Sequence, residues 1–212
     1  MKPMINMFSR AAAMLALSSI AMADGANYVG TSKDGLSKIW SSETAAAVAT
    51  KPESVIYDEA SAMAWFRTLG GEWDQTKADG TKIPDIGEKM SFKVIGAGST
   101  VMQSILPDTP REMTVMFHMD GPNKLLLDHF CAARNVPHMV FQKSDKPGEI
   151  IFKFAGGTNL NPKVDYFVHN QVYHIISKDA YVVQAATSGK GTLIEGDPIY
   201  NKRRGASMAA VQ

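Results

Sequence analysis

The spacing of hydrophobic residues changes once along the chain, close to residue 70. Between Tyr57 and Leu69 apolar side chains recur every three or four residues, which is typical of an amphipathic helix, and Gly70 and Gly71 supply a stop signal. After Gly71 apolar and polar residues alternate in short runs that are separated by turn residues. The pattern predicts one helix followed by a series of strands.

The predicted strands are short and consecutive, with no second long helix between them. They span residues 71–78, 88–95, 99–106, 112–119, 124–131, 138–143, 149–155, 165–176, 180–187 and 192–204. Strands joined by tight turns favour an antiparallel meander, and closing a meander into a barrel removes its exposed edges. We therefore predict an all-β fold: an up-and-down antiparallel barrel of about ten strands with a short N-terminal helix. A barrel of this width can hold a ligand in its lumen.

Residues 1–23 have the layout of a secretory signal peptide. Lys2 and Arg10 precede an apolar run, no acidic residue is present, and the segment ends in the small-residue motif Ala21-Met22-Ala23. Its apolar part is shorter than the roughly 20 residues that cross a bilayer. We expect an exported protein, in the bacterial periplasm or outside the cell, without a membrane span.

The rest of the chain divides into three parts. Residues 24–56 show no sustained periodicity and are expected to form a loosely ordered arm, in which an alanine-rich stretch could make one short helix. Residues 57–204 form the predicted barrel domain, and residues 205–212 a flexible tail.

Charge and cysteine content narrow the class of protein. The chain carries 22 Lys and Arg against 21 Asp and Glu, and 45% of it is hydrophobic, so it can form a core and has no basic excess for binding nucleic acid. The basic run at 202–204 is therefore interpreted as solvated charge at the end of the last strand. A single cysteine, Cys131, excludes an intrachain disulfide and a multi-cysteine zinc site.

Two short motifs resemble the lipocalin and fatty-acid-binding superfamily. Gly71-Glu72-Trp73 follows the predicted helix, and Arg203 lies near the end of the last predicted strand. The resemblance implies that the guanidinium of Arg203 stacks on the indole of Trp73 and closes one end of the barrel.

Longer segments resemble the exported bacterial domain-of-unknown-function family 1579, which is related in fold to lipocalins and to the haem-binding nitrobindins. These segments are 98–107, 112–113, 118–121, 129–131 and 135–139, and the resemblance covers about residues 60–204. It implies a lipocalin-like barrel. The chain differs from the family pattern at Gln103, Asp128, Val136 and His138. An acid is common at position 103, and the amide of Gln103 can serve neither as a base nor as a charged metal ligand.

The hairpin of strands 112–119 and 124–131 carries the candidate ligand site. A four-residue loop at 120–123 would pair Met119 with Lys124. One face would then hold Glu112, Met116, His118, His129 and Cys131. We expect this face to line the lumen, because ligand sites combine an apolar lining with a few convergent polar groups. A salt bridge from Glu112 would raise the pKa of His129. The alternative is that His129 and Cys131 are ordinary buried residues.

Other chemistries remain open at this point. His129 and Cys131 point the same way along one strand and, with Glu112, are the weak candidates for a transition-metal site. A haem, suggested by the nitrobindin resemblance, would use His169 or His174, which have opposite parity unless a bulge intervenes. A hydrolase would need Cys131 with His129, or Ser99, as nucleophile.

The sequence thus favours an exported barrel that binds a small, largely apolar molecule in its lumen, without turnover and with no cofactor predicted. The alternative is a metal- or haem-dependent catalyst that uses the same cavity.

The signal-peptide interpretation predicts cleavage after Ala23. N-terminal sequencing of the protein recovered from the periplasm or the medium should therefore begin at Asp24. Recovery of the exported protein with Met1 still in place would contradict this prediction.

Overall fold

The computed structural model describes residues 42–81, 83 and 89–206. The predicted signal peptide, its cleavage site, most of the predicted arm and the end of the tail lie outside the described residues. Within the described part of the chain, no helix is both long and apolar enough to cross a membrane.

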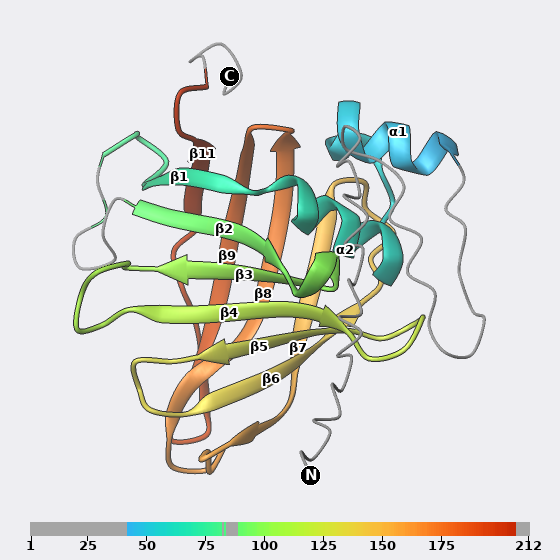
Figure 1. Cartoon of the computed structure of the whole chain (residues 1–212). Helices are drawn as coiled ribbons and strands as arrows, with labels where there is room; N and C mark the ends of the chain where they lie inside the picture. The colour runs from blue at the N-terminus through green and yellow to red at the C-terminus, as the bar shows by residue number, and fades with distance from the viewer. Residues whose placement is uncertain (1–41, 82, 84–88, 207–212) are drawn as a thin grey trace, which may run out of the picture.

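Short helices precede and interrupt a chain of strands (Figure 1). The helices are α1 (Ser42–Thr50), η1 (Pro52–Ser54), α2 (Glu59–Thr68) and η2 (Gly96–Gly98). The strands are β1 (Gly71–Thr76), β2 (Lys89–Ile95), β3 (Thr100–Ile105), β4 (Met113–Met119), β5 (Leu125–Phe130), β6 (Val136–Gln142), β7 (Glu149–Thr158), β8 (Tyr166–Ser177), β9 (Ala180–Gly189), β10 (Thr192–Glu195) and β11 (Ile199–Arg203).

The strands form one closed antiparallel barrel. Consecutive strands from β1 to β9 pair with one another, and β11 pairs with both β9 and β1, which closes the cylinder. β10 and β11 pair with successive parts of β9, so they share one position in a ten-stranded barrel. The predicted fold class is confirmed. The last strand, predicted as continuous over 192–204, is interrupted where Gly196 N donates to Ala185 O at 2.8 Å.

Helix α2 covers one end of this barrel (Figure 1). It begins at a capping box, in which Ser61 N donates to Asp58 Oδ1 at 2.7 Å and Asp58 N donates to Ser61 Oγ at 2.8 Å. Its inner face carries two buried aromatic side chains. Phe66 stacks on Phe117 with ring centroids 3.9 Å apart, and Trp65 meets Tyr181 edge-on at 5.4 Å. The barrel is filled by aromatic packing at this end.

Contacts of Trp73 and Arg203 attach the end of α2 to the barrel. The Arg203 Cζ lies 4.6 Å from the centre of the buried Trp73 ring, as the resemblance implied. The guanidinium also donates to the carbonyl oxygens of Gly70 at 2.8 Å and Thr68 at 2.9 Å, and Nε pairs with Asp179 at 2.8 Å. The residues that end α2 and begin β1 are therefore held by one side chain of β11.

Residues 42–56 belong to the segment expected to be a loosely ordered arm with one short helix. They form α1, which covers the alanine-rich stretch, and η1, and they pack on the barrel. Val48 and Val55 are buried in the core, and Val55 O accepts a hydrogen bond from Gly148 N at 2.9 Å. Gly148 has φ +70°, and a Cβ there would lie 2.8 Å from Glu53 O, so this close approach requires glycine. Buried apolar side chains thus hold this segment on the barrel, although its sequence shows no sustained helical periodicity.

Replacing Arg203 with Ala should lower the free energy of unfolding by about 2 kcal/mol, because the cation–π contact and several hydrogen bonds are lost together. Arg204→Ala is the matched control, since the Arg204 guanidinium pairs, among the described residues, with the partly exposed carboxylates of Glu72 and Asp74. Its loss should be below about 1 kcal/mol. Urea denaturation of both variants measures the difference, and an equal or reversed order would contradict the assigned roles.

Candidate functional site

Five buried polar side chains point into the barrel beyond the aromatic packing. They are Gln75, Gln103, His129, Gln171 and Asn201, which we call the polar layer. On each strand, the inward-facing residue two positions closer to α2 is either buried or hydrogen bonded to α2. For example, Trp73 precedes Gln75 on β1, and Leu127 precedes His129 on β5. The interior is thus apolar at the α2 end and polar further along the barrel.

Most of the polar layer is hydrogen bonded within the barrel. Gln75 Nε2 donates to Asn201 Oδ1 at 3.2 Å, and Tyr173 OH donates to Gln171 Oε1 at 2.6 Å. Gln103 Nε2 is directed at the sulfur of Met90. Gln75 Oε1 and both ring nitrogens of His129 have no hydrogen-bond partner among the described residues. An unpaired buried polar group lowers the stability of the fold by about 1–3 kcal/mol, so a hydrogen-bonding partner for these atoms would stabilise the protein.

His129 is the most isolated of these groups. It is 3% exposed and lies directly opposite Val115 of β4. Burial lowers the pKa of His129 to about 4, so the ring is neutral at physiological pH. A neutral imidazole offers one N–H donor and one nitrogen acceptor, and both are unused here. The site can therefore pair with a group that both accepts and donates a hydrogen bond.

The register of the β4–β5 hairpin differs from the predicted one by one residue. Met119 pairs with Leu125, so the loop runs from Asp120 to Lys124, and it is closed by Asp120 N donating to Lys124 O at 2.8 Å. A shift of one residue moves a strand's side chains to the opposite face. His129 faces inward with Leu127 and opposite Val115, whereas the alternation of β4 turns Glu112, Met116 and His118 outward. The predicted shared face is wrong.

The predicted contact between Glu112 and His129 is absent for the same reason. Glu112 accepts a hydrogen bond from Ser104 Oγ at 2.6 Å on the outer side. The pKa of His129 is therefore lowered by burial, not raised by a carboxylate as expected. Without that carboxylate, the predicted metal candidates Glu112, His129 and Cys131 are not assembled. No group of three His, Cys, Asp or Glu side chains suited to a metal ion occurs among the described residues.

The predicted nucleophiles are not activated by a histidine. Cys131 lies beyond the end of β5 in a turn, where its sulfur accepts from Ala133 N at 3.5 Å. His129 makes no hydrogen bond to it. Ser99 is exposed after η2, and its hydroxyl lies 3.4 Å from Thr100 Oγ1.

The two candidate haem ligands lie on opposite sides of β8. A bulge between Val168 and Asn170 makes His169 the extra residue of the ladder. The His169 ring lies 5.3 Å from Phe154, which faces inward opposite Met139. His174 is exposed on the outside, 3.5 Å from Glu149. Only His169 could contact a group inside the barrel.

A hydrogen-bonded chain of four side chains crosses the outside of the barrel, and the sequence analysis did not find it. His138 Nδ1 lies 2.6 Å from Asp128 Oδ1, His118 Nε2 lies 3.1 Å from Asp128 Oδ2, and Thr158 Oγ1 lies 2.9 Å from His138 Nε2. These residues come from four adjacent strands, β4 to β7. The only signal was that Asp128 and His138 depart from the family pattern.

The hydroxyl–imidazole–carboxylate order of this chain is that of acyl-transfer enzymes. Here it lies on a half-exposed strand face, and none of its members lines the pocket formed by Ala133, Asn135, Asn159, Asp165 and Tyr166. Its evident effect is to tie the four strands together.

A scan against protein-family models finds no match, and a search of curated proteins finds no significant relative.

The buried, neutral state of His129 predicts a pH-dependent stability. In the unfolded chain the ring has a pKa near 6.5, and in the folded protein about 4, so between these values only the unfolded chain binds the proton. The free energy of unfolding should fall by about 3 kcal/mol at most from this residue as the pH drops from 6.5 to 4.

His129→Leu removes this proton site while keeping an apolar side chain of similar size. Urea denaturation at neutral pH and near pH 4 should show a smaller loss of stability in the variant than in the wild type. Parallel losses in the two proteins would contradict a neutral, buried His129.

Proposed function

We propose that this protein is an exported, lipocalin-like barrel that binds a small, largely apolar molecule inside the barrel, without turnover. The molecule carries one polar group that hydrogen bonds to His129. Export rests on the signal-peptide pattern of residues 1–23. Similarity to lipocalins and to the exported domain-of-unknown-function family 1579 is part of the same proposal, supported by the closed barrel and the Trp73–Arg203 contact.

The observation that carries the proposal is His129, which is buried with both ring nitrogens unpartnered. Its nearest inner-face neighbours in the ladder are apolar, since Val115 lies opposite and Leu127 precedes it on β5. The side-chain nitrogens of Gln75, Gln103 and Asn201 are used within the barrel. Apolar side chains at the α2 end, with an unpaired imidazole in the polar layer beyond them, fit a molecule with an apolar body and a polar end. Binding would satisfy the imidazole, whose burial otherwise destabilises the fold.

The alternative, a haem- or metal-dependent catalyst, has one observation in its favour. His169 faces inward and packs beside the rings of Phe154 and Phe167. An axial histidine in an aromatic pocket is what a haem requires. The experiment below distinguishes this alternative by its visible absorption.

Native mass spectrometry of the protein purified from its own host tests the proposal. The wild type should carry a non-covalently bound organic molecule that is released on denaturation, with no visible absorption band. His129→Leu should lose it while unfolding at an equal or higher urea concentration, because an unpaired buried polar group has been removed. His174→Leu is the matched control, since His174 lies outside the barrel, and it should keep the molecule.

A dansyl-labelled fatty acid supplies an affinity scale for the same variants. Loss of one hydrogen bond in a dry site should weaken its binding to His129→Leu about tenfold, with no change for His174→Leu. Unchanged affinity in His129→Leu, together with lowered stability, would show that His129 has a purely structural role. A haem absorption band would instead support the catalytic alternative.

A further inference from the structure

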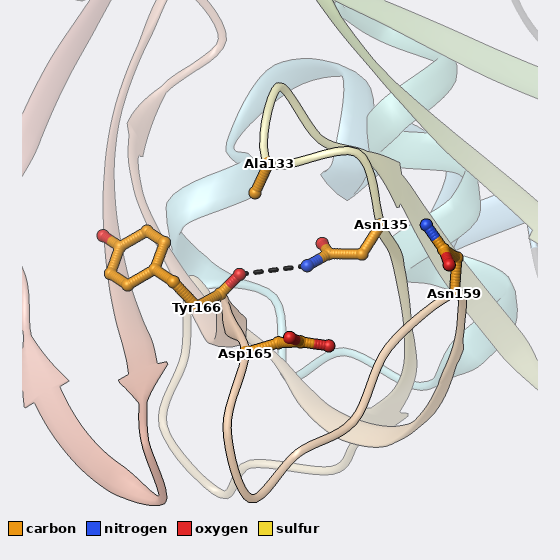
Figure 2. Close-up of a pocket in the computed structure, with 5 residues that line it drawn as sticks. All are labelled: Ala133, Asn135, Asn159, Asp165 and Tyr166. Atoms are coloured by element: carbon orange, nitrogen blue, oxygen red, sulfur yellow. Dashed lines mark hydrogen bonds between the residues drawn. The ribbon is translucent and has the colours of Figure 1, made fainter.

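A pocket of about 280 Å³ lies at the end of the barrel away from α2, between the loop that joins β5 to β6 and the loop that joins β7 to β8 (Figure 2). It is lined by Ala133, Asn135, Asn159, Asp165 and Tyr166. This pocket is distinct from the proposed binding site inside the barrel, because no residue of the polar layer lines it.

Asn135, which lines this pocket, carries a buried oxygen that has no partner among the described residues. The side chain is 4% exposed, and its Nδ2 donates to Tyr166 O at 3.0 Å, the bond drawn in Figure 2. Because a carbonyl oxygen can only accept, this bond fixes the orientation of the amide. The Oδ1 of Asn135 is therefore a true acceptor, and it has no partner among the described residues although it is buried.

Two further oxygen-bearing side chains converge on the same space. Asn159 Nδ2 donates to Arg134 O at 2.7 Å, which leaves its Oδ1 as an acceptor. The Asp165 carboxylate lies across the pocket from Asn159 and accepts from Asn161 N at 2.6 Å through Oδ2 (Figure 2). Among the described Lys, Arg and His side chains none forms an ion pair with Asp165. The lining side chains thus offer acceptors and a negative charge, but no cation.

We propose that this pocket binds a small organic ammonium ion. The N–H groups of an ammonium would donate to Asn135 Oδ1 and to the Asp165 carboxylate, which satisfies the buried amide and neutralises the acid. A calcium ion is the less suitable occupant, because it takes six to eight oxygen ligands at about 2.3–2.6 Å. Three side chains around a space of about 280 Å³ leave room for an organic group beside the charge.

Titration with n-propylammonium chloride, followed through the side-chain NH2 signals of Asn135 by NMR, tests this site. The signals should shift and saturate at millimolar concentration, and n-propanol, potassium chloride and calcium chloride should not reproduce the shift. Asp165→Asn keeps the acceptor for Asn161 N but removes the charge, and it should weaken binding at least about tenfold.

Asp108→Asn is the control variant. Asp108 is an exposed residue of the β3–β4 loop at the same end of the barrel, and its φ of +63° suits Asn as well. Affinity should stay within about twofold of the wild type. An equal loss in both variants, an unsaturated shift, or a calcium response matching that of propylammonium would overturn the proposal. The variant His129→Leu should bind propylammonium with the affinity of the wild type, so this experiment tests the pocket separately from the proposed site inside the barrel.

Discussion

The packing of Trp65 and Phe66 into one end of the barrel is the contact on which the rest of the structure depends. Phe66 stacks on Phe117, and Trp65 meets Tyr173 and Tyr181 edge-on, so one helix touches both sides of the cylinder. Arg203 then holds the chain as it passes from α2 into β1. Aromatic side chains therefore fill this end of the interior among the described residues.

The stability supplied by this closed end allows some polar groups in the rest of the interior to lack hydrogen-bond partners. A buried aromatic side chain stabilises the fold by a few kcal/mol, whereas each unpaired polar group costs about 1–3 kcal/mol. The barrel therefore tolerates an unpartnered His129 and an unpartnered Gln75 oxygen that a purely structural core would exclude. Residues that break a rule of packing without local compensation are expected at functional sites.

The sequence predicted the architecture well, because periodicity of two and turn residues are local signals. Nearly every predicted strand agrees with an observed one within a few residues, and the helix predicted from apolar spacing and the glycines after Leu69 agrees with α2. Register was not predictable in the same way. The β4–β5 loop contains Lys124 as a fifth residue, and this single residue places Glu112, Met116 and His118 on the face opposite to that of His129.

Loop and cross-strand sites escaped prediction for a related reason. Asn135, Asn159 and Asp165 are brought together by three separate chain positions that no periodic pattern connects. In the outer chain Asp128 and His138 lie directly opposite each other, whereas His118 and Thr158 are diagonal neighbours. A bulge in β7 also shifts the ladder between His138 and Met139. Bulges and loop lengths are set by tertiary packing, which a single sequence does not reveal.

A high-resolution crystal structure of the protein as isolated from its host tests the central claim most directly. The claim is that the barrel interior beyond the aromatic packing binds a small molecule. The account predicts density for a bound molecule or ordered water within hydrogen-bond distance of at least one His129 ring nitrogen. Apolar side chains packed tightly against both nitrogens, with neither water nor ligand beside them, would contradict it.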